Sequence, residues 1–168
     1  EDNVIHDGRD AILWYSTGVV VRGNVSYDCR YGLHLMFSDE VIIEGNELRG
    51  NSVGVYLMYS AGVELRRNRL LRNRGPSGYG IGLKETARLT VTDTRIAAKR
   101  VGAYIDGSPF TTAQPGVFSG NTIAWNDIGF TFLPSARGNQ IAGNNFIDNI
   151  EQVSVAGRGD LSGNQFWA

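Results

Sequence analysis

The sequence predicts an all-β protein, a parallel β-helix solenoid of about seven coils with roughly 22 residues in each coil. The segments Tyr31–Ser38 (YGLHLMFS) and Val53–Ser60 (VGVYLMYS) lie 22 residues apart, and Asp10–Ser16 (DAILWYS) is a weaker copy 22 residues upstream. A repeat of this period, built from short strands and turns, is typical of solenoids. No segment has a 3.6-residue apolar stripe with helix caps, so we expect no long helix.

Asparagines recur in step with this repeat. Successive members of the first column are 22, 22, 26, 27, 23 and 20 residues apart. They are Asn24, Asn46, Asn68, Thr94, Asn121, Asn144 and Asn164. A second column follows five residues later: Asn51, Asn73, Asn126 and Asn149, with Cys29 and Lys99 in the same place in other repeats. Asparagine amides can bond the backbone groups that turns leave unpaired, so we interpret both columns as structural.

Each repeat is expected to contain three short strands. We expect the long strands to be Ala11–Tyr15, Leu33–Phe37, Val55–Tyr59, Ile81–Lys84, Ala103–Asp106, Phe130–Leu133 and Val153–Val155. A second strand is expected at Val19–Val21, Val41–Ile43, Val63–Leu65 and Leu89–Val91. The predicted inward residues of the third are Leu48, Leu70, Ile96, Ile123, Phe146 and Phe166, with Ser26 as the exception. A leucine-rich repeat is the main competitor, but valine, isoleucine and phenylalanine share these positions with leucine.

Composition sets the outer limits of the interpretation. A chain of 168 residues can form one domain with a substantial core, and residues 1–168 are expected to form a single β-helix domain. The net charge of -1 gives no electrostatic argument for nucleic acid or an anionic membrane surface. No apolar run of 18 residues is present. The repeat is already under way at Val4, so we expect a fragment of a longer protein, or end coils covered by a partner.

The outward face of the long strands is unusual. Because side chains alternate along a strand, Leu35 and Leu57 should point inward while Met36 and Met58 point outward. His34 shares the outward face with these methionines. Thioether sulfur and imidazole nitrogen are ligands that suit copper(I) and do not suit calcium or magnesium. The competing interpretation is that the methionines are packing residues beneath a partner and His34 is a surface histidine.

The phrases YGLHLMFSDEVIIEGNELRGNSVGVYLMYSAGVELRRN and GYGIGLKE resemble the NosD family of nitrous oxide reductase maturation proteins over nearly the whole chain. The resemblance implies a periplasmic, right-handed, single-stranded parallel β-helix that is not an enzyme. It implies a role in copper-site maturation of nitrous oxide reductase, in denitrification. The implied partners are ABC transporter subunits, a copper lipoprotein chaperone and apo nitrous oxide reductase.

Residues and resemblance together predict a transient copper(I) site formed by His34, Met36 and Met58. We expect Trp14, one coil back, to shield the ion with a ring face, and Tyr56 to orient the imidazole. Cys29 is a weaker candidate ligand, because it lies in the turn column five residues before His34.

Two other functional classes remain open on the same fold. A carbohydrate-binding or polysaccharide-cleaving β-helix, similar to a lyase or an epimerase, needs clustered carboxylates on the outward face. The outward column Trp14, Met36, Met58, Lys84, Asp106 and Leu133 holds one carboxylate, and we interpret Lys84 and Asp106 as a surface ion pair. The polar cluster His6–Asp10 is interpreted as turn chemistry. A purely structural rod would have an ordinary polar outward face.

Two insertions break the repeat, at Arg74–Ser77 and at Gly107–Gly116. Both flank the outward face of the long strands, on adjacent coils. Loops on one side of a solenoid often mark its binding side. We therefore expect a partner to dock on this face around Trp14 and Tyr56, although tolerated surface insertions would look the same in sequence.

Overall fold

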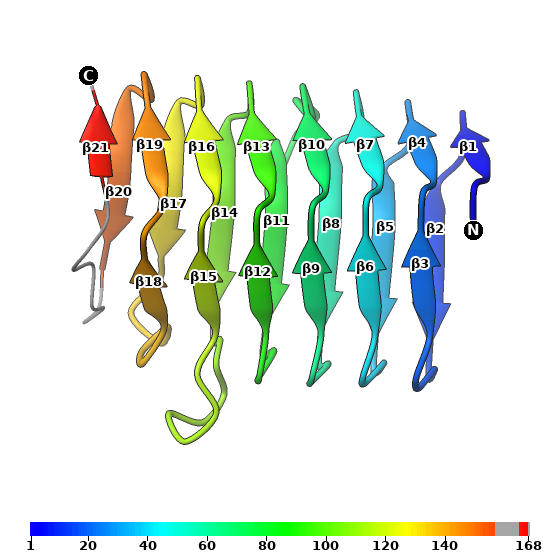
Figure 1. Cartoon of the computed structure of the whole chain (residues 1–168), viewed down its shortest axis with the longest axis horizontal. Coiled ribbons are helices and arrows are strands. Elements are labelled where there is room, and N and C mark those ends of the chain that lie inside the picture. Colours follow the sequence, from blue (N-terminus) through cyan, green and yellow to red (C-terminus); the bar gives the residue numbers. More distant parts are fainter. Residues whose placement is uncertain (157–164, 168) are drawn as a thin grey trace.

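The computed structural model, which describes residues 1–156 and 165–167, is a right-handed parallel β-solenoid of about seven coils with about 23 residues per turn. The coils lie side by side along the long axis of the molecule (Figure 1). Each complete coil contributes one strand to each of three sheets, and all strand pairs within the sheets are parallel. The described residues include no helix. The predicted fold is confirmed.

The sheet that carries the candidate site, here called the long-strand sheet, has seven strands. They are β2 (Asp10–Trp14), β5 (Tyr31–Met36), β8 (Val53–Met58), β11 (Tyr79–Lys84), β14 (Val101–Asp106), β17 (Ile128–Phe132) and β20 (Glu151–Val155). The six-stranded sheet contains β3 (Val20–Arg22), β6 (Ile42–Glu44), β9 (Glu64–Arg66), β12 (Thr90–Thr92), β15 (Val117–Ser119) and β18 (Gln140–Ala142). The eight-stranded sheet contains β1 (Val4–His6), β4 (Val25–Tyr27), β7 (Glu47–Arg49), β10 (Arg69–Leu71), β13 (Arg95–Ala97), β16 (Thr122–Ala124), β19 (Asn145–Ile147) and β21 (Gln165–Trp167).

Most strand boundaries differ from the predicted ones by one or two residues. The strand β5 begins at Tyr31, because Tyr31 already pairs with Val53 of the next coil. It ends before Phe37, since Phe37 has a φ of 52° and turns the chain. Tyr59 turns the next coil in the same way, with a φ of 53°. Strands β3, β6, β9 and β12 each begin one residue later than expected.

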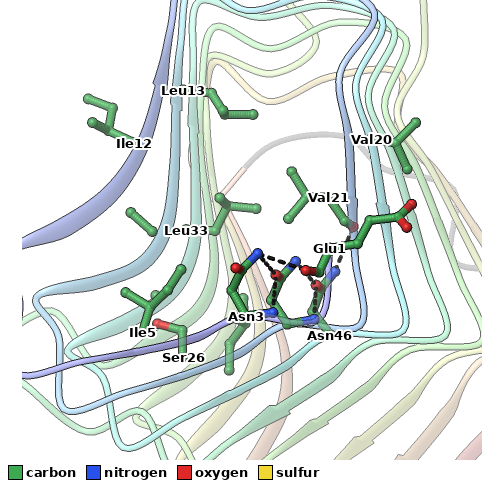
Figure 2. A pocket seen from close by; sticks show the side chains of 14 residues that line it. Glu1, Asn3, Ile5, Ile12, Leu13, Val20, Val21, Ser26, Leu33 and Asn46 are labelled. Carbon is green, nitrogen blue, oxygen red and sulfur yellow. Dashed lines mark hydrogen bonds between the residues drawn. The ribbon is translucent and has the colours of Figure 1, made fainter.

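One hydrophobic core runs through the coils. Leu35, Leu57 and Leu83 are adjacent in register and essentially inaccessible to solvent. The predicted inward residues Leu48, Leu70, Ile96, Ile123 and Phe146 are also buried, as is Ser26. The side chain of Phe166 and all of Asn164 lie outside the described residues. Figure 2 shows the core at the first coil, where Leu13, Val21 and Leu33 line a cavity.

The asparagine columns form hydrogen-bond ladders between coils. The backbone N–H of Asn24 donates to Oδ1 of Asn46, and the N–H of Asn46 donates to Oδ1 of Asn68, both at 2.9 Å. The hydroxyl of Thr94 continues this ladder by accepting from the N–H of Asn68. The second ladder is interrupted at Lys99, whose side chain has no oxygen and whose buried Nζ has no hydrogen-bond partner. The structural interpretation of the columns is confirmed.

A third ladder, which the sequence analysis did not identify, lies just after the long strands. The N–H of Ser16 donates to Oγ of Ser38, and the N–H of Ser38 donates to Oγ of Ser60. Two coils further on, Thr86 donates to Oγ of Ser108 in the same manner. These bonds stabilise the corners that follow strands β2, β5 and β11. They therefore help to fix the strands that carry the candidate site.

Candidate functional site

The two methionines occupy the same outward position on adjacent strands. Met36 of β5 pairs in register with Met58 of β8, and Trp14 of β2 precedes them in the same column. Both methionines are half-buried, whereas Leu35 and Leu57 beside them are fully buried. Adjacent strands are separated by about 4.8 Å, so two flexible thioethers are carried close together on the outer surface. The alternation predicted from the sequence is confirmed.

His34 lies two residues before Met36 on the same face, but it is not a surface histidine. Only 7% of the residue is exposed. The rings of Tyr31 and Tyr56 meet the imidazole edge-on, with centroids at 4.9 and 6.1 Å. These two tyrosines also stack on each other at 5.4 Å. The interpretation of His34 as an exposed histidine is therefore wrong, because neighbouring aromatic rings cover this outward position.

The imidazole of His34 has no hydrogen-bond partner at either ring nitrogen. Tyr56 therefore restricts the orientation of the imidazole by packing against it, not by a hydrogen bond. Burial lowers the pKa of His34, which favours the neutral ring that has a lone pair available for a metal. A buried nitrogen without a partner is uncommon in native structures and calls for an explanation, such as a ligand that the site receives.

An ion pair that was not foreseen from the sequence lies beside this histidine. Arg30 makes two hydrogen bonds to the carboxylate of Asp10, at 3.0 and 2.6 Å. Oδ2 of Asp10 is also 3.8 Å from Nδ1 of His34. Asp10 was assigned to turn chemistry with the rest of the His6–Asp10 cluster, but it begins strand β2 and faces the imidazole. The only feature of the sequence that could have placed Asp10 beside His34 is its position one repeat before Tyr31.

Trp14 is 57% exposed, and its ring stacks on Tyr15 with a centroid separation of 5.9 Å. Tyr15 stacks in turn on Phe37, and Phe37 on Tyr59, each at 5.0 Å. These rings form a column along the corner next to the methionines. The Trp14 ring packs on its neighbour Tyr15 in the corner, and its stacking toward a metal stays a prediction.

Two further predictions from the sequence concern Cys29 and the pair of Lys84 and Asp106. Cys29 is buried in the second ladder, where its thiol donates to the carbonyl of Tyr27 at 3.4 Å. Lys84 and Asp106 are direct neighbours in register, yet they form no ion pair. The surface ion pair predicted for them is wrong, because adjacent backbone positions do not force two long side chains to meet.

The two insertions lie at opposite ends of the long strands. Residues 74–77 precede β11, and residues 107–116 follow β14 as the largest loop in Figure 1. The Arg100 guanidinium holds the first by donating to the carbonyl of Pro76. The second loop is fastened by a hydrogen bond from the N–H of Arg88 to the carbonyl of Gln114. Both border the outward face of the long-strand sheet, as expected.

The donors gathered here define what the site could hold. Across residues 1–156 and the backbone of β21, no three His, Cys, Asp or Glu side chains come together as a metal-binding group. Ligand sets of the calcium or structural-zinc type are thus not formed in that part of the chain. Met36, Met58 and His34 share the outward face of β5 and β8, and thioether and imidazole groups match the preference of copper(I) for soft and intermediate ligands.

Comparison with known proteins gives one family match. A family model described as periplasmic copper-binding protein (NosD) matches residues 1–168. No curated protein matches the sequence. Among solved structures, the crystal structure of an alginate lyase from Paenibacillus sp. str. FPU-7 is similar, with a TM-score of 0.55 and 13% sequence identity. The match covers 88% of this chain and 68% of the lyase chain, and at this identity it shows a shared fold.

Proposed function

Because the chain belongs to the NosD family of periplasmic copper-binding proteins, we propose that it is an accessory protein for copper-site maturation of nitrous oxide reductase. In this role it receives copper(I) in the periplasm and passes it on, working together with an ABC transporter. It binds metal without catalysing a reaction. No helix in the described part of the chain is long and apolar enough to span a bilayer.

The observation that carries the proposal is the register of Met36 and Met58, with the unpartnered imidazole of His34 on the same face. Two thioethers bind copper(I) less tightly than thiolates would, and a relay must release its cargo. The site would therefore be suited to transfer rather than storage.

Access to His34 requires a movement of the side chains that cover it. Tyr31 and Tyr56 pack edge-on against the imidazole, and its nitrogens have no contact with solvent. The methionines are already half-exposed. Copper(I) would thus meet Met36 and Met58 first, and the imidazole would join once the tyrosine rings shift.

The proposed partners are the ABC transporter subunits, a copper lipoprotein chaperone and apo nitrous oxide reductase. Exposed Trp14 and half-buried Tyr56, Met36 and Met58 lie on neighbouring strands of the long-strand sheet, and exposed apolar areas often mark interaction sites. Cross-linkers placed on this face should capture the chaperone or the reductase. Cross-links that arise only from the six-stranded sheet, around Glu44 and Glu64, would contradict docking on this face.

A copper(I) competition titration tests the metal site. The variants are His34→Ala, Met36→Leu and Met58→Leu, since leucine keeps the packing of methionine without its sulfur. The matched control is His6→Ala, the other histidine of the chain, which is exposed. We expect weaker binding in all three site variants and no change in the control, with silver(I) as a redox-silent comparison. Unchanged affinity in all three would exclude this ligand set.

Polysaccharide cleavage is the alternative function, because an alginate lyase has a similar fold. In the column that continues beyond the methionines, Asp106 is the one carboxylate. An assay with pectin and alginate in the presence of calcium distinguishes the two functions. Cleavage that depends on Asp106 would favour the alternative.

A further inference from the structure

The chain as a whole has almost no net charge, but one of its segments is strongly basic. Residues 64–100 contain ten lysines and arginines but only three acidic residues. Of the two lysines among them, Lys99 is buried in the ladder and Lys84 lies on the long-strand sheet. The remaining positive charges are guanidinium groups, many of them around the eight-stranded sheet and the corner that leads to the long strands.

Two neighbouring hollows in the surface are lined by these arginines. The first is lined by Arg49, Arg69, Arg72 and Arg95, and the second by Arg30, Arg72 and Arg74. Arg72 belongs to both, so the hollows meet there. We call this set of six residues the arginine strip. The strands concerned, β7, β10 and β13, lie side by side toward the viewer in Figure 1, and β16 continues them.

The carboxylates near the strip pair with only four of its six arginines. Asp28 and Glu47 line the hollows, Asp10 pairs with Arg30, and Asp127 lies 3.8 Å from Arg74. Glu47 already pairs with Arg49 and Arg69, at 3.2 Å each. Within the described residues, Arg72 and Arg95 have no carboxylate within ion-pair distance. Guanidinium groups left without a counter-charge are available to an acidic ligand.

Apolar groups sit among these charges. The guanidinium of Arg95 lies 5.3 Å from the ring centroid of Trp125, and this ring is 49% exposed. Leu71 lines the same hollow from the neighbouring coil. Arginine and tryptophan are among the residues most enriched at the centres of protein interfaces.

We propose that the arginine strip is a docking surface for an extended, acidic segment of a partner protein. Aspartate and glutamate side chains of that segment would bind the guanidinium groups of Arg72 and Arg95, which present paired N–H donors to carboxylates. An apolar side chain between them would pack on Trp125 and Leu71. Arg72 and Arg95, which carry the proposal, belong to the eight-stranded sheet and the corner that follows it, whereas the candidate copper site lies on the long-strand sheet. Arg30 is the one strip residue that also borders that site, through Asp10, so the test of the strip uses Arg72 and Arg95 and is independent of copper binding.

The shape and chemistry of the strip favour a protein segment over other polyanions. The hollow lined by Arg72, Arg95 and Trp125 is concave, whereas a flat bilayer surface touches protruding groups. An acidic polysaccharide would supply the charge but no apolar side chain for Trp125 and Leu71. The expected binding is electrostatically steered, so it weakens as the salt concentration rises.

The test is a titration of the intact 168-residue chain with a labelled peptide of Asp and Glu residues that contains one phenylalanine. The double variant Arg72→Glu, Arg95→Glu should bind it about tenfold more weakly than the native chain, since two charge pairs are reversed. The matched control is Arg88→Glu, Arg137→Glu, which makes the same charge change at exposed positions off the strip and should bind as the native chain does. A thermal melt of each variant verifies that the fold is retained.

An oligouronate of equal charge and vesicles of anionic lipid serve as competing probes. The proposal requires that the peptide bind more tightly than either, and that replacing its phenylalanine by serine weaken binding. Equal or tighter binding of the oligouronate or the vesicles would overturn the assignment to a protein segment. Failure of the peptide to bind, or equal loss in the control variant, would overturn the docking surface itself, whatever the copper titration shows.

Discussion

The ring of Tyr56 occupies the space that a side chain at position 82 would need. Gly82 follows Tyr56 in register on the next coil, and a Cβ atom there would come to 2.5 Å from two ring carbons of Tyr56. The glycine therefore permits the tyrosine to lie along the sheet. Because Tyr56 also packs on His34, the absence of a side chain at Gly82 is linked to the covering of the imidazole.

We predict that Gly82→Ala uncovers His34. The added methyl group should displace the Tyr56 ring, destabilise the fold by about 1–3 kcal/mol through overpacking, and raise the reactivity of His34 toward diethylpyrocarbonate severalfold. Mass spectrometry of the modified protein separates His34 from the exposed His6, which serves as an internal reference. Thr131→Ala, at the same outward position two coils further on, is the control. Equal protection of His34 in both variants would contradict the link.

The alternation of the long strands gives a second prediction, on stability. Leu57 is fully buried and Met58 is half-buried on the opposite face. Leu57→Ala should lower the free energy of unfolding by about 2–5 kcal/mol, because it leaves a cavity in the core. Met58→Ala should cost far less, since its neighbours can rearrange and solvent can enter. Urea denaturation of both variants measures the difference, and similar losses would refute the assigned register.

The buried amine of Lys99 gives a third prediction, on pH. Burial, with a smaller contribution from the charge of Arg74, lowers the pKa of Lys99 to about 6. In the unfolded chain the lysine pKa is about 10.4. Between these values the unfolded chain binds a proton that the folded chain does not. The free energy of unfolding should therefore rise with pH across this window, and the penalty from Lys99 is largest below pH 6.

Replacing this lysine should remove that dependence. Lys99→Asn removes the titrating group and supplies an amide oxygen that can accept from Asn73 N–H, as Asn73 does for Asn51 and Asn126 does for Lys99. The variant should be more stable at pH 7 by at least about 1–3 kcal/mol, since a buried polar group gains partners. Urea melts at pH 6, 7.5 and 9 measure both effects. Lys84→Asn is the control, and a matching change in its pH profile would show that the effect does not come from Lys99.

The repeat made most of the fold predictable. In a solenoid each residue contacts its equivalent one coil away. The regular spacing of Asn24, Asn46 and Asn68 in the sequence therefore predicts that these residues lie next to one another in the structure, where they bond in a ladder. Alternation along strands adds the inward or outward direction, which placed Leu35 and Met36 correctly. Strand boundaries were less exact, because the left-handed conformation of Phe37 has no marker comparable to glycine.

The sequence by itself thus determined the coil, the core and the shared face of His34, Met36 and Met58. Tertiary structure decided the surroundings of these residues. The covering of His34 by Tyr31 and Tyr56, its neighbour Asp10, and the gathering of Arg72 and Arg95 depend on how long side chains lie across corners and coils. Side-chain direction is free to vary on an outer surface, whereas the packed interior permits little choice. Backbone periodicity therefore specifies the interior, and contacts between side chains of different coils specify the surface.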